Sequence, residues 1–192
     1  AGRKSVWFDS RFYRANLLWN GGRFGFRDIH LFDERFESDY LRRPGTSTQC
    51  FYATLPLVDG FNWSTATDTA GLYLAAADAQ GRIVPVPTGD PEVSETAAGE
   101  LTVSTPVLSG GRCRIVFTED AVRIFLPEGS GLLFALHVAP DKTLPFVEVG
   151  DRRIRARFRD FDYGVECTQG TVDASLPDCV RFVPDGKGEL TL

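Results

Sequence analysis

The sequence predicts an all-β protein, an antiparallel β-sandwich of the jelly-roll kind, with a closed β-barrel as the alternative. Short runs rich in aromatic and β-branched residues recur along the chain, turn residues separate them about every 8–12 residues, and helix signals are scarce. The same pattern continues on both sides of every turn-rich stretch. We therefore expect residues 1–192 to form a single domain.

The first two strands are expected near the N-terminus. Aromatic and polar residues mix at two-residue spacing over Val6–Trp19 and again over Arg23–Phe32, with an Asn-Gly pair between the runs. Asn-Gly at this position is a strong hairpin signal, because both central residues of the turn must accept positive φ. The two runs are therefore expected to pair in antiparallel fashion. In a regular strand, one face would carry Phe24, Phe26, Asp28, His30 and Phe32.

Further elements follow from the turn residues. Residues 33–45 have the pattern of a short helical turn or loop that ends at a Pro-Gly pair. Residues 65–79 are rich in alanine, but a tyrosine and nearby glycines favour a strand that turns at residues 79–81. Residues 87–100 are polar, rich in proline and glycine and free of aromatics, which predicts a loop.

The charge balance excludes some partners. A net charge of −5 and a pI of about 5.1 argue against a nucleic-acid partner, because such proteins normally present a basic face. No apolar run approaches the roughly 20 residues of a membrane-spanning helix. No glycine-rich phosphate-binding motif occurs, so no cofactor is expected.

Cysteine usage bears on location. Four cysteines allow two disulfides, and we expect Cys167 and Cys179 to be close enough for one, because turn residues between them would fold the segment back. Lysine is scarce, and Asn62 begins an Asn-Trp-Ser sequon. These features favour an extracellular or cell-surface location over the cytoplasm. The chain is expected to be a mature protein or an excised domain.

The main candidate for chemistry lies at the end of the second expected strand. Four residues there supply oxygens and an imidazole: Asp28, His30, Asp33 and Glu34. Such groups ligate hard or borderline cations, and His137 could add a second imidazole. Neither H-E-x-x-H nor H-x-H occurs, so no metal is assigned, and Asp28 and His30 remain the candidate ligands. The alternative is a hydrogen-bonded strand histidine and a satisfied core histidine.

Two pairs of acids are candidates for carboxylate catalysis. Glycoside cleavage needs two carboxyl groups about 5–10 Å apart across a cleft. The pairs are Asp28 with Asp33 and Asp160 with Asp162. A serine triad has no support, because no G-x-S-x-G motif is present and the chain has only two histidines. Whether the protein is an enzyme stays open.

Arginines alternate with apolar residues in the segment DRRIRARFRDFDY. On a strand, one face would carry four guanidinium groups, those of Arg153, Arg155, Arg157 and Arg159. Such a row could bind carboxylate, sulfate or phosphate groups. The alternative is a solvated face on which acids from neighbouring strands lie opposite the arginines.

Aromatic residues exceed what a small core usually needs, and exposed rings can stack on the C–H faces of sugars. Trp63 follows an Asp-Gly turn and stands close to Asn62 and Asp59, whose side chains could bond sugar hydroxyls. The alternative for this indole is packing in the core or at its rim.

Together these features predict a glycan-associated β-sandwich module or accessory subunit that binds carbohydrate or another small anionic ligand. In texture the sequence resembles the β-sandwich modules attached to bacterial carbohydrate-active enzymes, although no motif carries the resemblance to particular residues. One alternative is a sugar-acting enzyme, of the glycoside hydrolase or lyase type, with a carboxylate pair or a metal near His30. The other is a structural or adhesion module. A partner domain or a second copy of the chain is compatible with all three.

Overall fold

The computed structural model describes residues 2–37, 54–176 and 179–192, and these ranges are all β. They contain no helix, and every strand pairing within them is antiparallel. The strands form open sheets of nine, five and three strands, so the closed-barrel alternative is wrong for this part of the chain. A search of the same ranges for a helix of bilayer-spanning length and hydropathy finds none.

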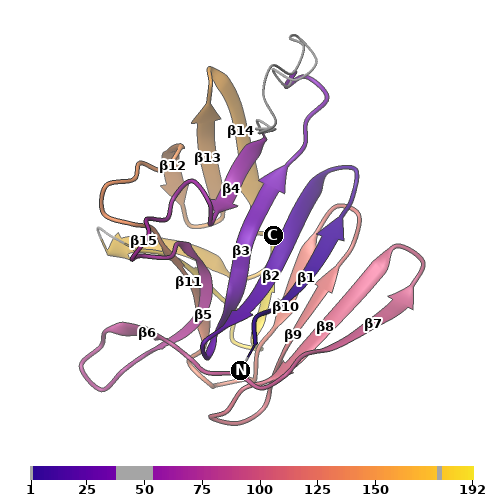
Figure 1. Cartoon of the computed structure of the whole chain (residues 1–192), viewed down its shortest axis with the longest axis vertical. Coiled ribbons are helices and arrows are strands. Elements are labelled where there is room, and N and C mark those ends of the chain that lie inside the picture. Colours follow the sequence, from indigo (N-terminus) through magenta and orange to yellow (C-terminus); the bar gives the residue numbers. More distant parts are fainter. Residues whose placement is uncertain (1, 38–53, 177–178) are drawn as a thin grey trace.

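The nine-stranded sheet has the order β1-β2-β3-β5-β11-β16-β15, with β4 paired to β3 and β6 paired to β5. Its strands are β1 (Lys4–Asp9), β2 (Tyr13–Asn20), β3 (Arg23–Leu31), β4 (Leu55–Asp59), β5 (Gly71–Ala77), β6 (Ile83–Pro85), β11 (Leu133–His137), β15 (Thr171–Leu176) and β16 (Cys179–Val183). Strands from the two halves of the chain are therefore neighbours in one sheet (Figure 1).

Two smaller sheets complete the described structure. The five-stranded sheet, in the order β17-β10-β9-β8-β7, contains β7 (Glu92–Ala97), β8 (Glu100–Pro106), β9 (Arg112–Phe117), β10 (Val122–Phe125) and β17 (Glu189–Thr191). The three-stranded sheet contains β12 (Phe146–Gly150), β13 (Arg153–Phe158) and β14 (Phe161–Glu166), in that order. In Figure 1 this small sheet stands beside β4, and the Tyr163 hydroxyl donates to the Pro56 carbonyl at 2.7 Å.

The nine-stranded and five-stranded sheets share one hydrophobic core. Phe117 of β9 stacks on Phe8 of β1, with ring centroids 5.2 Å apart, and meets Phe26 of β3 edge-on at 6.2 Å. The Tyr13 hydroxyl of β2 donates to the carbonyl of Thr118, just beyond β9, at 2.8 Å. Tyr13, Phe26 and Phe117 belong to one buried cluster and the partly buried Phe8 packs against it, so both sheets contribute side chains to the same core.

The predicted hairpin near the N-terminus is confirmed. Asn20 and Arg23 are partners in the β2–β3 ladder, so the two-residue turn is Gly21-Gly22, and both glycines have positive φ (59° and 83°). The run that leads into it is two strands, β1 and β2, and not one. The hydroxyl oxygen of Ser10 accepts hydrogen bonds from the backbone N–H groups of Phe12 and Tyr13, which fixes a turn inside that run.

A β-bulge in β3 changes which side chains face the core. Asn16 pairs with Asp28 and Leu17 pairs with Phe26, so Arg27 is an extra residue in the ladder. An extra residue shifts the two-residue alternation of side chains by one. The core side of β3 therefore carries Phe24, Phe26 and Ile29, and the opposite side carries Asp28 and His30. The expectation that all alternate residues from Phe24 to Phe32 share one face is wrong.

Two further expectations concern single elements. The alanine-rich segment contains β5, as expected, and Gly81 donates its N–H to the Asp78 carbonyl in the turn before β6. The prediction of a loop over residues 87–100 is wrong, because this segment contains β7. All residues of β7 are exposed, and it is an edge strand paired with β8. Residues 38–45 of the expected helical turn lie outside the described ranges.

The expected disulfide is also wrong, since Cys167 and Cys179 are both free. Cys179 pairs with Leu176 at one end of the β15–β16 hairpin, whereas Cys167 precedes β15 at the other end. A six-residue strand, roughly 16 Å long, separates those ends. The expectation of an extracellular location loses its main support with this bridge. Cys113 is also free, and Cys50 lies outside the described residues.

Candidate functional site

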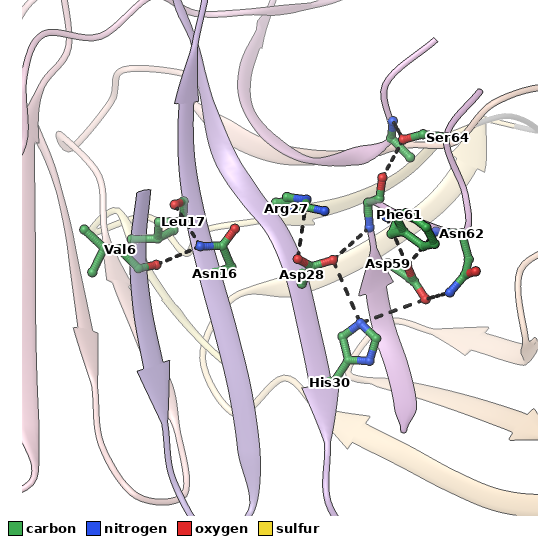
Figure 2. Close-up of polar contacts among 12 residues, drawn as sticks. Val6, Asn16, Leu17, Arg27, Asp28, His30, Asp59, Phe61, Asn62 and Ser64 are labelled. Atoms are coloured by element: carbon green, nitrogen blue, oxygen red, sulfur yellow. Dashed lines mark hydrogen bonds and ion pairs between the residues drawn. The ribbon is translucent and has the colours of Figure 1, made fainter. Parts of the chain in front are cut away.

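Three buried polar side chains meet where β3 pairs with β4. Asp28 and Asp59 are direct partners in the β3–β4 ladder, and His30 follows on the same side of β3. The His30 Nε2 lies 4.0 Å from the Asp28 Oδ1 and 4.0 Å from the Asp59 Oδ2 (Figure 2). All three residues are at most 7% exposed. We call this group the Asp–His–Asp cluster.

The turn after β4 fixes the carboxylate of Asp59. Its Oδ1 accepts hydrogen bonds from the backbone N–H groups of Phe61 and Asn62 at 3.1 and 2.8 Å. Its Oδ2 accepts from the Asn62 side-chain amide at 2.7 Å. An aspartate that bonds to backbone groups two and three residues ahead is a local turn motif, so the sequence Asp-Gly-Phe-Asn itself orients this carboxylate.

Gly60 brings this turn against the bulge in β3. Its N–H donates to the Arg27 carbonyl at 2.8 Å and lies 3.2 Å from the Asp28 Oδ1. A β-carbon at this position would be 2.7 Å from both the carbonyl oxygen and the γ-carbon of Arg27. Only glycine allows this approach without a backbone shift, and the approach places Asp59 opposite Asp28.

His30 is held by one ring nitrogen. Its Nδ1 is hydrogen-bonded to the Thr54 hydroxyl. Its Nε2 has no hydrogen bond in the described part of the chain, because 4.0 Å to each carboxylate is too long for one. When the Nδ1–H donates to Thr54, the Nε2 lone pair points at the two acids. A ring nitrogen anchored in this way is typical of histidines that ligate metals.

Burial sets the charge state of the cluster. Burial raises the pKa of Asp28 and the facing Asp59 adds to the rise, whereas Arg27, 3.6 Å away, and His30 oppose it. Burial lowers the pKa of His30, although both carboxylates pull it upward. The imidazole is therefore neutral near pH 7, so the partly exposed Arg27 guanidinium is left to offset the two acids that face each other across the strands. A cation or an extra proton would relieve this arrangement.

The cluster opens into a pocket of about 500 Å³ between β4 and the end of β13. The lining residues of this β4–β13 pocket are His30, Thr54, Pro56, Asp59, Asn62, Trp63, Thr143, Leu144, Pro145, Arg157, Phe158 and Arg159. Trp63 is only 6% exposed and packs edge-on against Phe146, so its indole is not an open stacking platform. The floor of the pocket is acidic and aromatic, and its rim is basic.

Other candidate residues do not join the cluster. Asp33 forms a two-pronged pair with Arg35, which lowers the Asp33 pKa to about 2. Glu34 pairs with Arg11 at 2.7 Å. His137 is exposed and bonds to Asp68 in a different pocket. Asp160 lies in the β13–β14 turn, and Asp162 pairs with an arginine at the surface. One member of each expected pair of catalytic acids is thus held by an arginine: Asp33 by Arg35 and Asp162 by Arg157.

Asp59 takes the place expected for Asp33. The sequence singled out Asp59 as a sugar-bonding neighbour of Trp63, not as a partner of His30. The pairing of β3 with β4, separated by more than twenty residues in the chain, brings them together. The sequence does show that Asp59 ends an apolar segment just before a glycine, which indicates a turn. This pattern does not show which strand pairs with that segment.

The arginine row follows the predicted alternation in part. Arg153, Arg155 and Arg157 are exposed on β13, whereas Ile154 and Ala156 between them are buried. The acids opposite them are present: Arg155 pairs with Glu148 at 2.9 Å, and Arg157 pairs with Asp162 at 2.7 and 2.9 Å. Arg159 has a φ of 49° and belongs to the turn, not to the row. These contacts favour the solvated face over a continuous anion-binding surface.

Comparison of the chain with models of known protein families, with curated proteins and with solved structures finds no match. The described residues form an all-β protein in which a buried Asp–His–Asp cluster borders a pocket lined in part by arginines. What this class of site can do follows from its chemistry.

Proposed function

We propose that the protein binds an acidic carbohydrate through a divalent cation held by Asp28, His30 and Asp59. One observation carries the proposal: the Nε2 of a nine-tenths buried, neutral histidine forms no hydrogen bond with any described residue and lies 4.0 Å from two facing carboxylates. One nitrogen and two carboxylates suit Mn²⁺ or Zn²⁺ better than Ca²⁺, which takes oxygen ligands.

The distances support an ion of this size. The ligand atoms of the cluster all lie within 4.8 Å of one another. At metal–ligand bonds of roughly 2.1 Å, two atoms in tetrahedral positions are about 3.4 Å apart. The longest separation between two ligand atoms would therefore shrink by about 1.4 Å around an ion, a movement of about 0.7 Å for each atom. Three protein ligands leave one or more coordination positions for a ligand in the pocket.

The rim supports an anionic ligand. Arg157 uses Nε and Nη2 in its pair with Asp162, so Nη1 is the guanidinium nitrogen outside that pair. A carboxylate that reaches the cation from the pocket would approach the basic rim, and Asn62 and Thr54 line the pocket where sugar hydroxyls would lie. The volume of about 500 Å³ suits one or two sugar rings.

Thermal unfolding tests the cation. The protein is freed of metal with EDTA, and MnCl₂ or ZnCl₂ is then added. At a cation concentration about 100 times Kd, binding adds about 2.7 kcal/mol, a rise in Tm of roughly 5–10 °C. Asp28→Asn should abolish the rise with Mn²⁺ and Zn²⁺, and the matched surface variant Asp162→Asn should keep it. No rise with either ion, or a rise retained in Asp28→Asn, would overturn the proposal.

Calorimetric titration tests the sugar. Oligomers of galacturonate or glucuronate should bind to the Mn²⁺-loaded protein and not to the EDTA-treated protein. The neutral oligomers of galactose and glucose are the control, and they should not bind. Equal binding of acidic and neutral sugars would contradict the role of the carboxylate, even if the cation site stands.

A second candidate is an elimination enzyme acting on the same sugars. The observation that favours it is the neutral imidazole, which lines the pocket and can accept a proton through Nε2. The imidazole would take the proton next to the sugar carboxylate, a carbon–carbon double bond would form, and the bond to the neighbouring glycosidic oxygen would break. That oxygen would leave with a proton from water.

The two candidates differ in the role of His30, because Nε2 cannot bind a cation and a proton at once. Incubation with polygalacturonate, followed by ultraviolet absorbance of the unsaturated product, separates them. Product formation that disappears in His30→Ala would establish the enzyme. Cation-dependent binding without product formation would support the binding function and contradict the enzyme.

We also propose that the shared core makes the fold a β-sandwich of the nine-stranded and five-stranded sheets. The ring contacts of Phe117 with Phe8 and Phe26 support it. The proposal does not extend to jelly-roll connectivity, because β7, β8, β9 and β10 are consecutive neighbours in a meander.

A further inference from the structure

A second pocket, of about 630 Å³, lies over β5, β6, β11 and β16 of the nine-stranded sheet. It shares no lining residue with the β4–β13 pocket. Its polar and ionisable lining residues are Arg23, Asp68, Tyr73, Arg82, His137 and Cys179. We call it the β5–β11 pocket.

The floor of the β5–β11 pocket is apolar and shallow. Ala75 and Ala135 are buried, on adjacent strands, and belong to a small cluster separate from the main core. Pro85 of β6 pairs with Ala75 at one side, and Tyr73 pairs with Ala135 at the other. Small side chains between a proline and a tyrosine leave a flat surface of the kind that accepts a ring.

One guanidinium in this pocket has no ion-pair partner among the residues that the structure describes. Arg82 is paired with Asp78 at 2.8 Å, and His137 is paired with Asp68 at 2.5 Å. The guanidinium of Arg23 lies 5.8 Å from the centre of the Tyr73 ring and forms no ion pair with any residue that the structure describes. The pocket therefore joins an apolar floor to a guanidinium that no ion pair with a described residue occupies.

The thiol in the pocket does not make it a catalytic site. Burial raises the pKa of Cys179, although Arg181 opposes the rise. The thiol is therefore protonated near neutral pH, and a protonated thiol is a poor nucleophile. The Tyr73 hydroxyl is also occupied, because it donates to the carbonyls of Thr69 and Ala70 at 3.1 and 3.2 Å. The lining groups favour binding over chemistry.

We propose that the β5–β11 pocket binds a small organic anion with an apolar ring, such as an aromatic carboxylate. The ring lies on Ala75 and Ala135, and the carboxylate accepts hydrogen bonds from Arg23. The site is independent of the Asp–His–Asp cluster, since none of its groups belongs to that cluster and no cation is required.

Titration by nuclear magnetic resonance with benzoate as the probe tests this site. Benzoate should shift the amide signals of β5 and β11, and benzamide, which has the same ring without the charge, should bind at least about tenfold more weakly. Arg23→Gln should weaken benzoate by a similar factor, because Arg23 is exposed and its removal leaves the core intact. Arg153→Gln, an exposed arginine outside the pocket, should leave binding unchanged.

A filling variant provides the second arm. Ala135→Leu should abolish benzoate binding while unfolding remains cooperative. EDTA should leave benzoate binding unchanged, which separates this site from the proposed cation site. Equal affinity for benzoate and benzamide, or full affinity in Arg23→Gln, would overturn the proposal whatever the outcome at the cluster.

Discussion

The β3–β4 pair and the β13–β14 hairpin each place two charged residues directly opposite one another on antiparallel strands, but the charges and their burial differ. In the hairpin, Arg157 and Asp162 are ladder partners of opposite charge, and each is about half exposed. In β3–β4, the ladder partners Asp28 and Asp59 have the same charge and are buried. The Arg157–Asp162 pair is neutral as a whole, whereas the Asp28–Asp59 pair carries like charges that Arg27, 3.6 Å from Asp28, offsets only in part. Charge imbalance under burial, not charge density, therefore distinguishes the candidate site from the other charged regions described.

The energetics follow from the same difference. An exposed ion pair contributes about 0–1 kcal/mol, because solvent screens it and two long side chains lose freedom. A buried carboxylate with a like charge opposite is costly until a proton, a cation or hydrogen bonds compensate it. Four predictions test the comparison.

The largest expected effect is on stability when one acid is removed from each region. Asp59→Ala removes the acceptor for three N–H groups of Phe61 and Asn62 and should lower the free energy of unfolding by about 1–3 kcal/mol. Asp162→Ala breaks only a solvent-screened pair and should cost clearly less stability than Asp59→Ala. Urea unfolding measures both, and equal losses would contradict the comparison.

The second effect has the opposite sign. Asp28→Asn keeps an oxygen for the Gly60 N–H and removes the like charge that faces Asp59. In EDTA at pH 7 it should raise the free energy of unfolding by up to about 1 kcal/mol, the scale of a like-charge cross-strand pair. Asp162→Asn is the control and should give no gain. A clear loss of stability in Asp28→Asn would show that Arg27 already balances this carboxylate.

The third effect is a dependence on pH. The folded pKa of His30 lies below the ordinary value of 6.5, so in acid the unfolded chain takes up a proton that the folded chain does not. This residue should therefore lower stability as the pH falls from about 6.5 toward its folded pKa. His30→Gln should remove the part of the stability loss in acid that comes from this histidine.

The measurement compares Asp28→Asn with Asp28→Asn/His30→Gln between pH 7 and pH 5. The common background removes the titration of Asp28. That titration has the opposite sign, because a raised folded pKa makes stability fall as the pH rises above 3.8. Identical pH profiles for the two variants would contradict the depressed pKa of His30.

The smallest effect is expected in the hairpin. Arg155→Gln breaks an ion pair with Glu148 in which both side chains are more than half exposed. The loss of stability should be under about 0.5 kcal/mol and should disappear at high salt. A loss above about 1 kcal/mol would mean that the arginine row stabilises the fold, in conflict with its solvated character.

The sequence predicts the all-β class because local signals dominate there. Gly21 and Gly22 permit the tight turn that pairs β2 with β3, and the tyrosine in the alanine-rich segment indicates a strand. The edge strand β7 could not be predicted, because its residues are all exposed and it therefore has no pattern of alternating apolar residues. Its pairing with β8 holds it in the sheet. The prediction of a disulfide between Cys167 and Cys179 is wrong because two turn signals do not determine which residues of a hairpin lie opposite each other.

Part of the site could also be predicted. Asp28 and His30 are recognisable as candidate ligands from their types and spacing, and Asp59 from its turn. Their meeting depends on two facts with no local signature: the pairing of β3 with β4 and the extra residue Arg27. A register shift of one residue changes the face of every later side chain, and composition does not record it.

The bulge in β3 also has a consequence for chain length. If Arg27 were absent, the remaining residues from Phe24 to Leu31 would alternate regularly, with the same side chains facing the core. Arg27 is therefore an inserted residue that adds a cation beside Asp28 without disturbing the rest of the strand. In an alignment of related chains, its loss should appear as a single gap inside a strand, where gaps are normally rare. That gap, more than any substitution, would separate chains that hold Arg27 against the Asp28 carboxylate from chains that keep only the scaffold.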